Sequence, residues 1–188
     1  MEDWVDTVRV GTLELRLERP REAEVLEAAL REDAFEPPYW AELWPSGIAL
    51  AGVLAERNLT GLRVIELGCG LALPSLAAKA RGAIVLATDR DPQALGYARR
   101  NGLETMVVDL ADPPDLPRFD LAIGADVLYE RAFAEGLAVL LPQLADELLL
   151  AVPTRPKSPE RCAAIAPGWQ RTSVSAGAIE LLTIRRPA

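Results

Sequence analysis

Short apolar segments alternate with helical segments through most of the chain, and this alternation constrains the fold more than any other feature. The expected elements are strand 64–67, helix 74–81, strand 84–89, helix 92–100, strand 105–109, strand 119–125, helix 132–143 and strand 147–152. Strands joined by helices pair in parallel, and a parallel sheet must be covered on both faces. The pattern therefore predicts an α/β, doubly wound and mostly parallel sheet.

The two ends of the chain carry a different pattern. At the start, alternating residues 6–17 around Gly11-Thr12 predict a β-hairpin, and residues 21–31 have helical spacing. At the other end, a short helix over 159–165 is followed by strands 169–175 and 179–185, joined at Ala176-Gly177. So short a turn joins antiparallel strands. We expect one domain, with residues 1–45 as an extension and residues 46–188 as the core.

Helix boundaries are marked by capping signals. Asp91-Pro92 is typical of a helix start, because the carboxylate caps the free amides and proline fits the first turn. Asn101-Gly102 is typical of a helix end.

Composition excludes several classes of function. The 188 residues include no histidine and two cysteines, so a zinc site, a histidine-based triad and a disulfide framework are disfavoured, and no metal is expected. A net charge of −8 opposes nucleic-acid binding. No segment has the roughly 20 apolar residues of a membrane span, and the start MEDWVD does not resemble a secretory signal, so we expect a cytoplasmic protein without a membrane partner.

The stretch VIELGCGLALP reads as strand, tight turn and helix, and predicts a nucleotide cofactor held by backbone amides. The dinucleotide fingerprint needs a third glycine where Leu73 stands, so NAD fits poorly. The pattern acidic-x-Gly-x-Gly-x-Gly is met by Glu66, Gly68 and Gly70, with Ala72 in the last place.

This turn resembles motif I of the class I, seven-stranded S-adenosylmethionine-dependent methyltransferases, whose Rossmann-like sheet ends in an antiparallel hairpin. Asp89 ends the second strand about 20 residues after the glycines, where a carboxylate can accept both ribose hydroxyls. Asp91 could exchange roles with it, one capping and one binding. The resemblance implies that Asp109, at the end of the third strand, and the backbone of Leu110 meet the adenine edge.

Two further segments resemble one branch of these enzymes. In PPYWAELWPSGIAL, Trp40 and Trp44 would share a face on a helical turn and could be core residues, but the segment is similar to the W-x-x-x-W-P segment of the family-16 and electron-transfer-flavoprotein β-subunit type protein-lysine methyltransferases. Bacterial members are called predicted nicotinamide N-methylases. The resemblance places Trp44 beside the cofactor. Asp126 and Tyr129 in DVLY have the Asp-x-x-Tyr form of that branch.

The resemblance implies methylation of a lysine in a protein substrate. Asp126 is expected to orient the acceptor ammonium or the methionine end of the cofactor, and Tyr129 to pack on the amine or hydrogen-bond to it. Alternatives are a small amine or pyridine acceptor, or a cofactor-binding module without activity. Ala72 and the segment 151–156 depart from the family pattern. The first departure is expected to change loop packing only, and the second to alter the acceptor pocket.

Overall fold

The computed structural model describes residues 4–21 and 38–187, and the expected helix over 21–31 lies almost wholly outside them. The strands are β1 (Trp4–Val10), β2 (Leu13–Arg19), β3 (Arg63–Leu67), β4 (Ile84–Asp89), β5 (Glu104–Val107), β6 (Leu121–Ala125), β7 (Glu147–Pro153), β8 (Gln170–Ala176) and β9 (Ile179–Arg185). The helices are the short 3-10 helix η1 (Tyr39–Ala41), α2 (Pro45–Ala55), α3 (Leu73–Ala80), α4 (Pro92–Arg100), α5 (Arg131–Leu144) and α6 (Ser158–Ala164).

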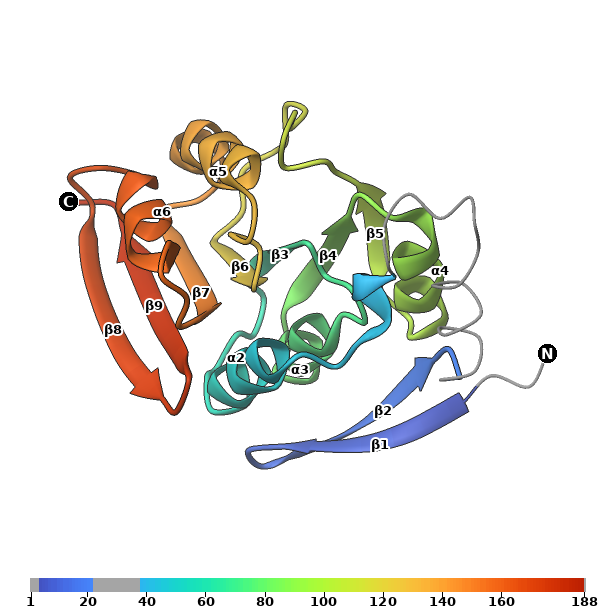
Figure 1. The fold of residues 1–188 in the computed structure, drawn as a ribbon. Helices are drawn as coiled ribbons and strands as arrows, with labels where there is room; N and C mark the ends of the chain where they lie inside the picture. Colours follow the sequence, from blue (N-terminus) through green and yellow to red (C-terminus); the bar gives the residue numbers. More distant parts are fainter. Residues whose placement is uncertain (1–3, 22–37, 188) are drawn as a thin grey trace.

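Seven strands form one sheet in the order β5-β4-β3-β6-β7-β9-β8 (Figure 1). Strands β3 to β7 pair in parallel, whereas β9 runs antiparallel to β7 and β8 runs antiparallel to β9. The predicted α/β architecture with a terminal hairpin is therefore confirmed. The turn between β8 and β9 is Gly177-Ala178, one residue later than expected.

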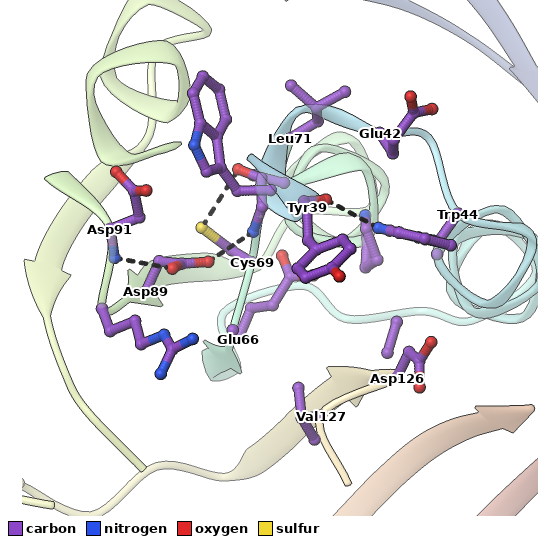
Figure 2. A pocket seen from close by; sticks show the side chains of 18 of the residues that line it. Tyr39, Glu42, Trp44, Glu66, Cys69, Leu71, Asp89, Asp91, Asp126 and Val127 are labelled. Atoms are coloured by element: carbon purple, nitrogen blue, oxygen red, sulfur yellow. Dashed lines mark hydrogen bonds between the residues drawn. The ribbon is translucent and has the colours of Figure 1, made fainter. Parts of the chain in front are cut away.

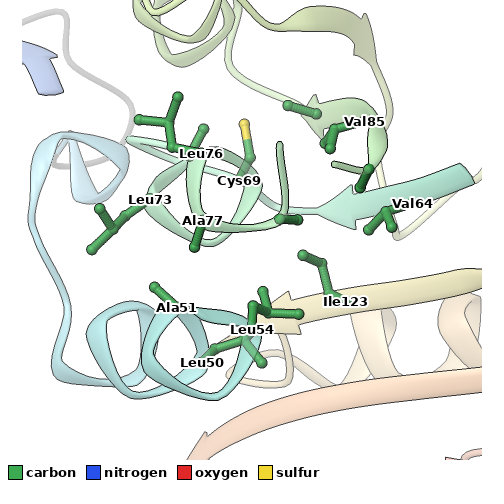
Figure 3. Packing of buried hydrophobic residues seen from close by; sticks show 14 of the residues in the cluster. Leu50, Ala51, Leu54, Val64, Cys69, Leu73, Leu76, Ala77, Val85 and Ile123 are labelled. Carbon is green, nitrogen blue, oxygen red and sulfur yellow. The ribbon is translucent and has the colours of Figure 1, made fainter. Parts of the chain in front are cut away.

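Alternate residues of each central strand face opposite layers of helices. Val64, Leu121 and Leu149 join a cluster with α2, α3 and α4, while Ile65, Ala122 and Leu148 join a cluster with α5. Figure 3 shows part of the first cluster, where side chains of α2 and α3 pack beside β3 and β6. The two-sided burial explains why these strands read as nearly continuous apolar runs.

The N-terminal hairpin β1–β2 packs outside α2, α3 and α4 (Figure 1). Asn101, at the end of α4, holds β2 in place: its Oδ1 accepts from the Glu18 amide at 2.8 Å and its Nδ2 donates to the Glu18 carbonyl at 2.8 Å. The residue predicted to end a helix therefore also fixes the hairpin on the core.

Sequence reasoning missed helix α2. The helix begins at Pro45 directly after Trp44 and ends before Glu56. A proline in the first helical turn was the available signal. Its sequence PSGIALAGVLA lacks the polar stripe of a surface helix, because much of its circumference is covered by neighbouring elements.

Strand β3 pairs with β4 on one side and with β6 on the other, so the order of strands along the chain reverses between β3 and β6. Open α/β sheets bind ligands outside the carboxyl ends of their strands at this point. Leu67 pairs with Gly124 there, immediately before the glycine turn and the Asp126 segment. The topology therefore directs the search for a site to this edge.

Because Gly136 in α5 has no side chain, the segment after β5 can pack directly against this helix near the carboxyl edge of the sheet. A Cβ atom at Gly136 would overlap the carbonyl oxygen of Leu110. We expect Gly136→Ala to destabilise the protein by about 3 kcal/mol or more, because either the helix or the backbone of Leu110 must move. Chemical denaturation measures the change.

Gly96→Ala is the matched control, because Gly96 lies in α4 and a Cβ atom added there would meet nothing within 4 Å. Replacing a helical glycine in open space stabilises by about 0.5–1 kcal/mol. Denaturation midpoints of the two variants should therefore shift in opposite directions, and equal shifts would contradict the close packing at Gly136.

Candidate functional site

A cavity of about 1110 Å³ opens at the carboxyl edge of the sheet. Typical ligand pockets enclose about 300–1,000 Å³, so this one accommodates a nucleoside with an amino-acid tail and part of an acceptor. The predicted site residues all line it: Trp44, Glu66, Gly68, Gly70, Asp89, Asp109, Leu110, Asp126 and Tyr129. The structure brings these residues together, and what each one binds stays a prediction. Figure 2 shows several of them around the opening.

The glycine turn uses backbone conformations that glycine adopts most easily. Gly68 and Gly70 have φ angles of 61° and 49°. A Cβ atom at Gly68 would lie 2.8 Å from Cγ1 of Val127, and one at Gly70 would lie 3.0 Å from the carbonyl oxygen of Trp40. Both glycines are therefore required by conformation and by close packing of their neighbours.

Ala72 stands at the last position of the glycine pattern and keeps the backbone conformation of a glycine. Its φ is 57° and its ψ is 30°, and it precedes the first turn of α3. A left-handed alanine costs roughly 1–2 kcal/mol. Its methyl group is buried in the core with α2 and α3, which offsets part of that cost. The departure from the family pattern therefore leaves the path of the turn intact.

Asp89 connects the end of β4 to the glycine turn. One carboxylate oxygen accepts from the Gly70 amide at 2.8 Å and the other from the Asp91 amide at 2.9 Å (Figure 2). Each oxygen retains a second lone pair, so both can still accept a ligand hydroxyl. Burial raises the pKa of this carboxyl above its ordinary value, although the backbone amides of Asp91, Gly70 and Arg90 oppose the shift.

The two acidic residues at this strand end have separate structural roles. Asp91 caps α4, since its Oδ1 accepts from the Gln93 amide at 2.8 Å, while Asp89 is 8% exposed. The sequence left open which of the two residues caps the helix, and the structure shows that Asp91 does.

Glu66 lies beneath the glycine turn and is 1% exposed. Its Oε2 accepts from the Ser75 amide of α3 at 2.9 Å. Burial raises the pKa of this carboxyl to about 8, and the negative charge of Asp89 adds to the rise. Burial thus favours the protonated form of Glu66, and a cation placed next to it would favour its ionised form.

Asp109 and Leu110 border the side of the cavity expected to hold a base. Strand β5 ends at Val107, so Asp109 lies in the following loop and not at the strand end as predicted. The Asp109 Oδ1 accepts from the Ala111 amide at 2.9 Å, which closes a local turn. Leu110 is buried against α5, and its backbone adjoins Gly136.

Trp40 and Trp44 do not share a helical turn, so the alternative in which the pair forms one helical face does not apply. Trp40 belongs to η1 and stacks on Tyr97, with ring centroids 5.7 Å apart, whereas Trp44 follows that helix and precedes α2. The short helix ends at Ala41, and Glu42 and Trp44 both have extended backbones, which Pro45 favours at Trp44. Trp44 donates from its indole Nε1 to the Tyr39 carbonyl at 2.9 Å and remains 40% exposed at the cavity rim (Figure 2).

Asp126 follows β6 with a left-handed φ of 54°, and its amide donates to the Ala151 carbonyl at 2.9 Å. Arg155, from the loop after β7, donates to both carboxylate oxygens at 2.8 and 2.7 Å. Burial raises the pKa of Asp126, while Arg155 lowers it in part. Sequence reasoning missed Arg155 as a site residue, although it lies in the segment 151–156 that departs from the family pattern.

Tyr129 lies on the same side of the cavity mouth. Its ring packs edge-on against Phe133 of α5, with centroids 5.1 Å apart, and it is 41% exposed. Arg161 of α6 holds the backbone here by donating to the carbonyls of Leu128 and Tyr129. Contacts with α5 and α6 thus fix the loop that carries the Asp-x-x-Tyr residues.

Within the described ranges, no helix is both long and apolar enough to cross a bilayer, and no group of side chains forms a metal site. Cys69 is buried in the glycine turn, and burial raises the pKa of its thiol well above the ordinary value. A thiol held in the protonated form is a poor nucleophile.

Comparison with known proteins agrees with this geometry. No family model matches the chain. It is 36% identical over 112 residues to the electron transfer flavoprotein beta subunit lysine methyltransferase of Danio rerio, covering 55% of this chain and 43% of that protein. It is 36% identical over 125 residues to the histone-arginine methyltransferase METTL23 of Xenopus laevis, covering 58% and 53%. The chain thus spans about half the length of the curated relatives it matches.

Among solved structures, a 16S rRNA methyltransferase of Thermus thermophilus in complex with AdoMet and guanosine superposes with a TM-score of 0.67. The match covers 98% of this chain and 51% of that chain at 15% identity, so it establishes the fold alone. The fold is that of the seven-stranded methyltransferases. The similarity to the electron-transfer-flavoprotein type, predicted from the W-x-x-x-W-P segment and the Asp-x-x-Tyr motif, is confirmed.

The raised pKa of Glu66 predicts how stability depends on pH. In the unfolded chain this carboxyl ionises near its ordinary 4.5, but in the folded protein only near 8. The stabilising contribution of Glu66 to the unfolding free energy is therefore fully present below about pH 4.5 and is lost as pH rises toward 8. Glu66→Gln keeps an acceptor for Ser75 without a charge. Between about pH 5.5 and pH 9, its unfolding free energy should fall by about 3 kcal/mol less than that of the wild type.

Denaturant titrations at both pH values measure this difference. Glu104→Gln, on an exposed position of β5, is the control and should follow the wild-type pH dependence. Parallel curves for Glu66→Gln and the wild type would show that Glu66 ionises normally in the folded protein.

Proposed function

We propose that this protein is an S-adenosylmethionine-dependent N-methyltransferase acting on a lysine side chain of a protein. The observation that carries the proposal is the Asp89 carboxylate facing the cavity beside a turn in which side chains at Gly68 and Gly70 would crowd Val127 and Trp40. The similarity to a relative named as a protein-lysine methyltransferase supports the reaction type. The other relative is named for histone arginine, which supports a protein acceptor with a nitrogen nucleophile.

The residues around the cavity fit this cofactor. Asp89 would accept the two ribose hydroxyls on its remaining lone pairs, and Asp109 with the backbone of Leu110 would meet the adenine edge. The glycine turn leaves room for the nucleoside to approach the backbone. Glu66 and Trp44 border the remaining space toward Asp126, where the methionine portion would lie.

Bound S-adenosylmethionine would supply a methyl carbon activated on a sulfonium sulfur, which takes up the electron pair of the breaking bond as the acceptor nitrogen attacks. The task of the protein is then alignment and desolvation. Tyr129, Tyr39 and Trp44 form an exposed aromatic rim that would enclose an acceptor side chain. The nitrogen must attack as a neutral amine, and with no histidine in the chain its proton would pass to solvent.

Both cysteines of the chain are unpaired, which is usual in reducing compartments and favours a cytoplasmic protein.

Cofactor binding is tested by replacing the two neighbouring acids. Asp89→Asn should weaken S-adenosylhomocysteine binding about tenfold or more, because a charge-assisted acceptor for the ribose is lost. Asp91→Asn should leave the affinity almost unchanged, since asparagine also caps a helix. Isothermal titration calorimetry gives both affinities, and NAD is titrated in parallel.

Unfolding midpoints of both variants are measured alongside, because Asp89 also holds two backbone amides. Equal affinities in the two variants, or stabilisation of the wild type by NAD alone, would contradict the proposed cofactor site.

Acceptor class is tested by incubating the protein with methyl-labelled S-adenosylmethionine and a cell lysate. We expect label in a protein band, acid-stable and located on lysine by mass spectrometry of the labelled peptide. Asp89→Asn is the matched control and should give little label. Label confined to the low-mass fraction would replace the protein acceptor by a small amine, and cofactor binding without any transfer would indicate a module without activity.

A further inference from the structure

Arg155 is hydrogen-bonded to Asp126, the carboxylate to which an acceptor cation would be expected to bind. Its guanidinium forms two parallel hydrogen bonds with Asp126, from Nη1 to Oδ1 at 2.8 Å and from Nη2 to Oδ2 at 2.7 Å. The Asp126 side chain is 13% exposed and that of Arg155 is 45% exposed, so the arginine covers the carboxylate from the solvent side. A bidentate pair of this kind is among the strongest hydrogen-bonded contacts between side chains.

Hydrogen bonds hold the backbone before and after Arg155 in place. The Thr154 amide donates to the Ala178 carbonyl at 2.8 Å, and the Arg155 carbonyl accepts from the Ser158 amide at 3.0 Å. Ser158 also donates from its hydroxyl to the Pro153 carbonyl at 2.9 Å. Because the loop after β7 is anchored at these points, Arg155 approaches Asp126 from a fixed direction, and little backbone entropy opposes the pairing.

Other charged residues besides Arg155 also line the cavity as possible partners of Asp126. The remaining charged or phenolic residues that line it are Tyr39, Glu42, Glu66, Asp89, Arg90, Asp91, Asp109 and Tyr129. Arg90 lies over the ring of Phe133 and within 4.0 Å of Glu130. Figure 2 shows Asp126 and Asp89 on opposite sides of the cavity. Among the described residues, Arg155 is the charged group whose interaction alters the pKa of Asp126.

We propose that Arg155 is a specificity-determining residue: it pairs with Asp126, keeps an acceptor ammonium off that carboxylate, and so admits the acceptor nitrogen in its neutral, reactive form. The inference rests on the proposed methyl transfer to nitrogen. Under this inference, Arg155 sets the protonation state of the acceptor nitrogen. Asp126 by itself would not keep that nitrogen neutral.

The electrostatics follow from the opposite effects of the two charges. A bare carboxylate next to an amine raises the amine pKa and holds it as an unreactive ammonium, whereas a fixed cation lowers that pKa. A lysine amine, with an ordinary pKa of about 10.4, is already almost wholly protonated at neutral pH. A site that presented Asp126 without Arg155 would thus bind the acceptor more tightly and transfer to it more slowly.

Ligand binding gives the first test and needs no knowledge of the acceptor. With S-adenosylhomocysteine saturating, n-butylammonium is titrated at neutral pH and followed by ligand-observed NMR. We expect Arg155→Met to bind n-butylammonium at least about tenfold more tightly than the wild type. Adding Asp126→Asn should remove the gain, and asparagine tolerates the left-handed backbone at this position.

Lys157→Met is the matched control, because Lys157 is an exposed cation two residues away that does not line the cavity. It should bind n-butylammonium like the wild type. If the wild type fails to bind S-adenosylhomocysteine, the proposed function is wrong. If that binding is intact and Arg155→Met gains no affinity for n-butylammonium, the role of Arg155 is wrong and the proposed function stands.

The pH dependence of transfer to the protein labelled in the lysate gives the second test. In Arg155→Met the rising limb of the rate should move to higher pH by about one unit, with a roughly tenfold slower rate at neutral pH and a lower KM for the acceptor. The Arg155→Met, Asp126→Asn double variant should return the limb toward the wild type. A uniform fall in rate at every pH, or an unmoved limb, would overturn the proposal.

Discussion

The hydrogen bonds from Gly70 and Asp91 to Asp89 are the contacts on which the rest of the site depends. They join the end of β4 to the turn after β3, two strands that the sheet places side by side. Without a buried acceptor at this point, the amide of the turn would be desolvated and unpaired, at a cost of about 1–3 kcal/mol. The same carboxylate thus orders the glycine turn and faces the cavity, so the binding surface is prepared before any ligand arrives.

The part of the cavity around the glycine turn, where the cofactor is proposed to bind, could be predicted because its signals are local in sequence. The apolar run ending at Glu66, the two glycines and the Asp91-Pro92 helix start each specify a backbone conformation within a few residues. Their spatial meeting then follows from the rule that parallel strands present their carboxyl ends at one edge. The boundary error that affects a site residue here is the end of β5 at Val107, which leaves Asp109 in the loop.

The part of the cavity around Trp44, Asp126 and Arg155, where the acceptor is proposed to bind, could not be predicted to the same degree, because its geometry comes from contacts between distant segments. A four-residue spacing indicated a helical turn for Trp40 and Trp44, but stacking on Tyr97 and a proline-initiated helix separate the two side chains. The Arg155–Asp126 pair joins loops 29 residues apart in sequence, and no local pattern encodes it. The departure of segment 151–156 from the family pattern marked the position without revealing the contact.

Three carboxyl groups around the cavity share one electrostatic property. Burial raises the pKa values of Glu66, Asp89 and Asp126, and the amides and the guanidinium that contact them oppose the rise only in part. Buried carboxyls that remain partly uncompensated favour a cationic ligand, because its charge lowers their pKa values and supplies the missing partner. The proposed cofactor carries such charges on its sulfonium and its ammonium. Arg155 limits this attraction at Asp126, and under our proposal the cavity therefore favours a cation in the cofactor and a neutral nitrogen in the acceptor.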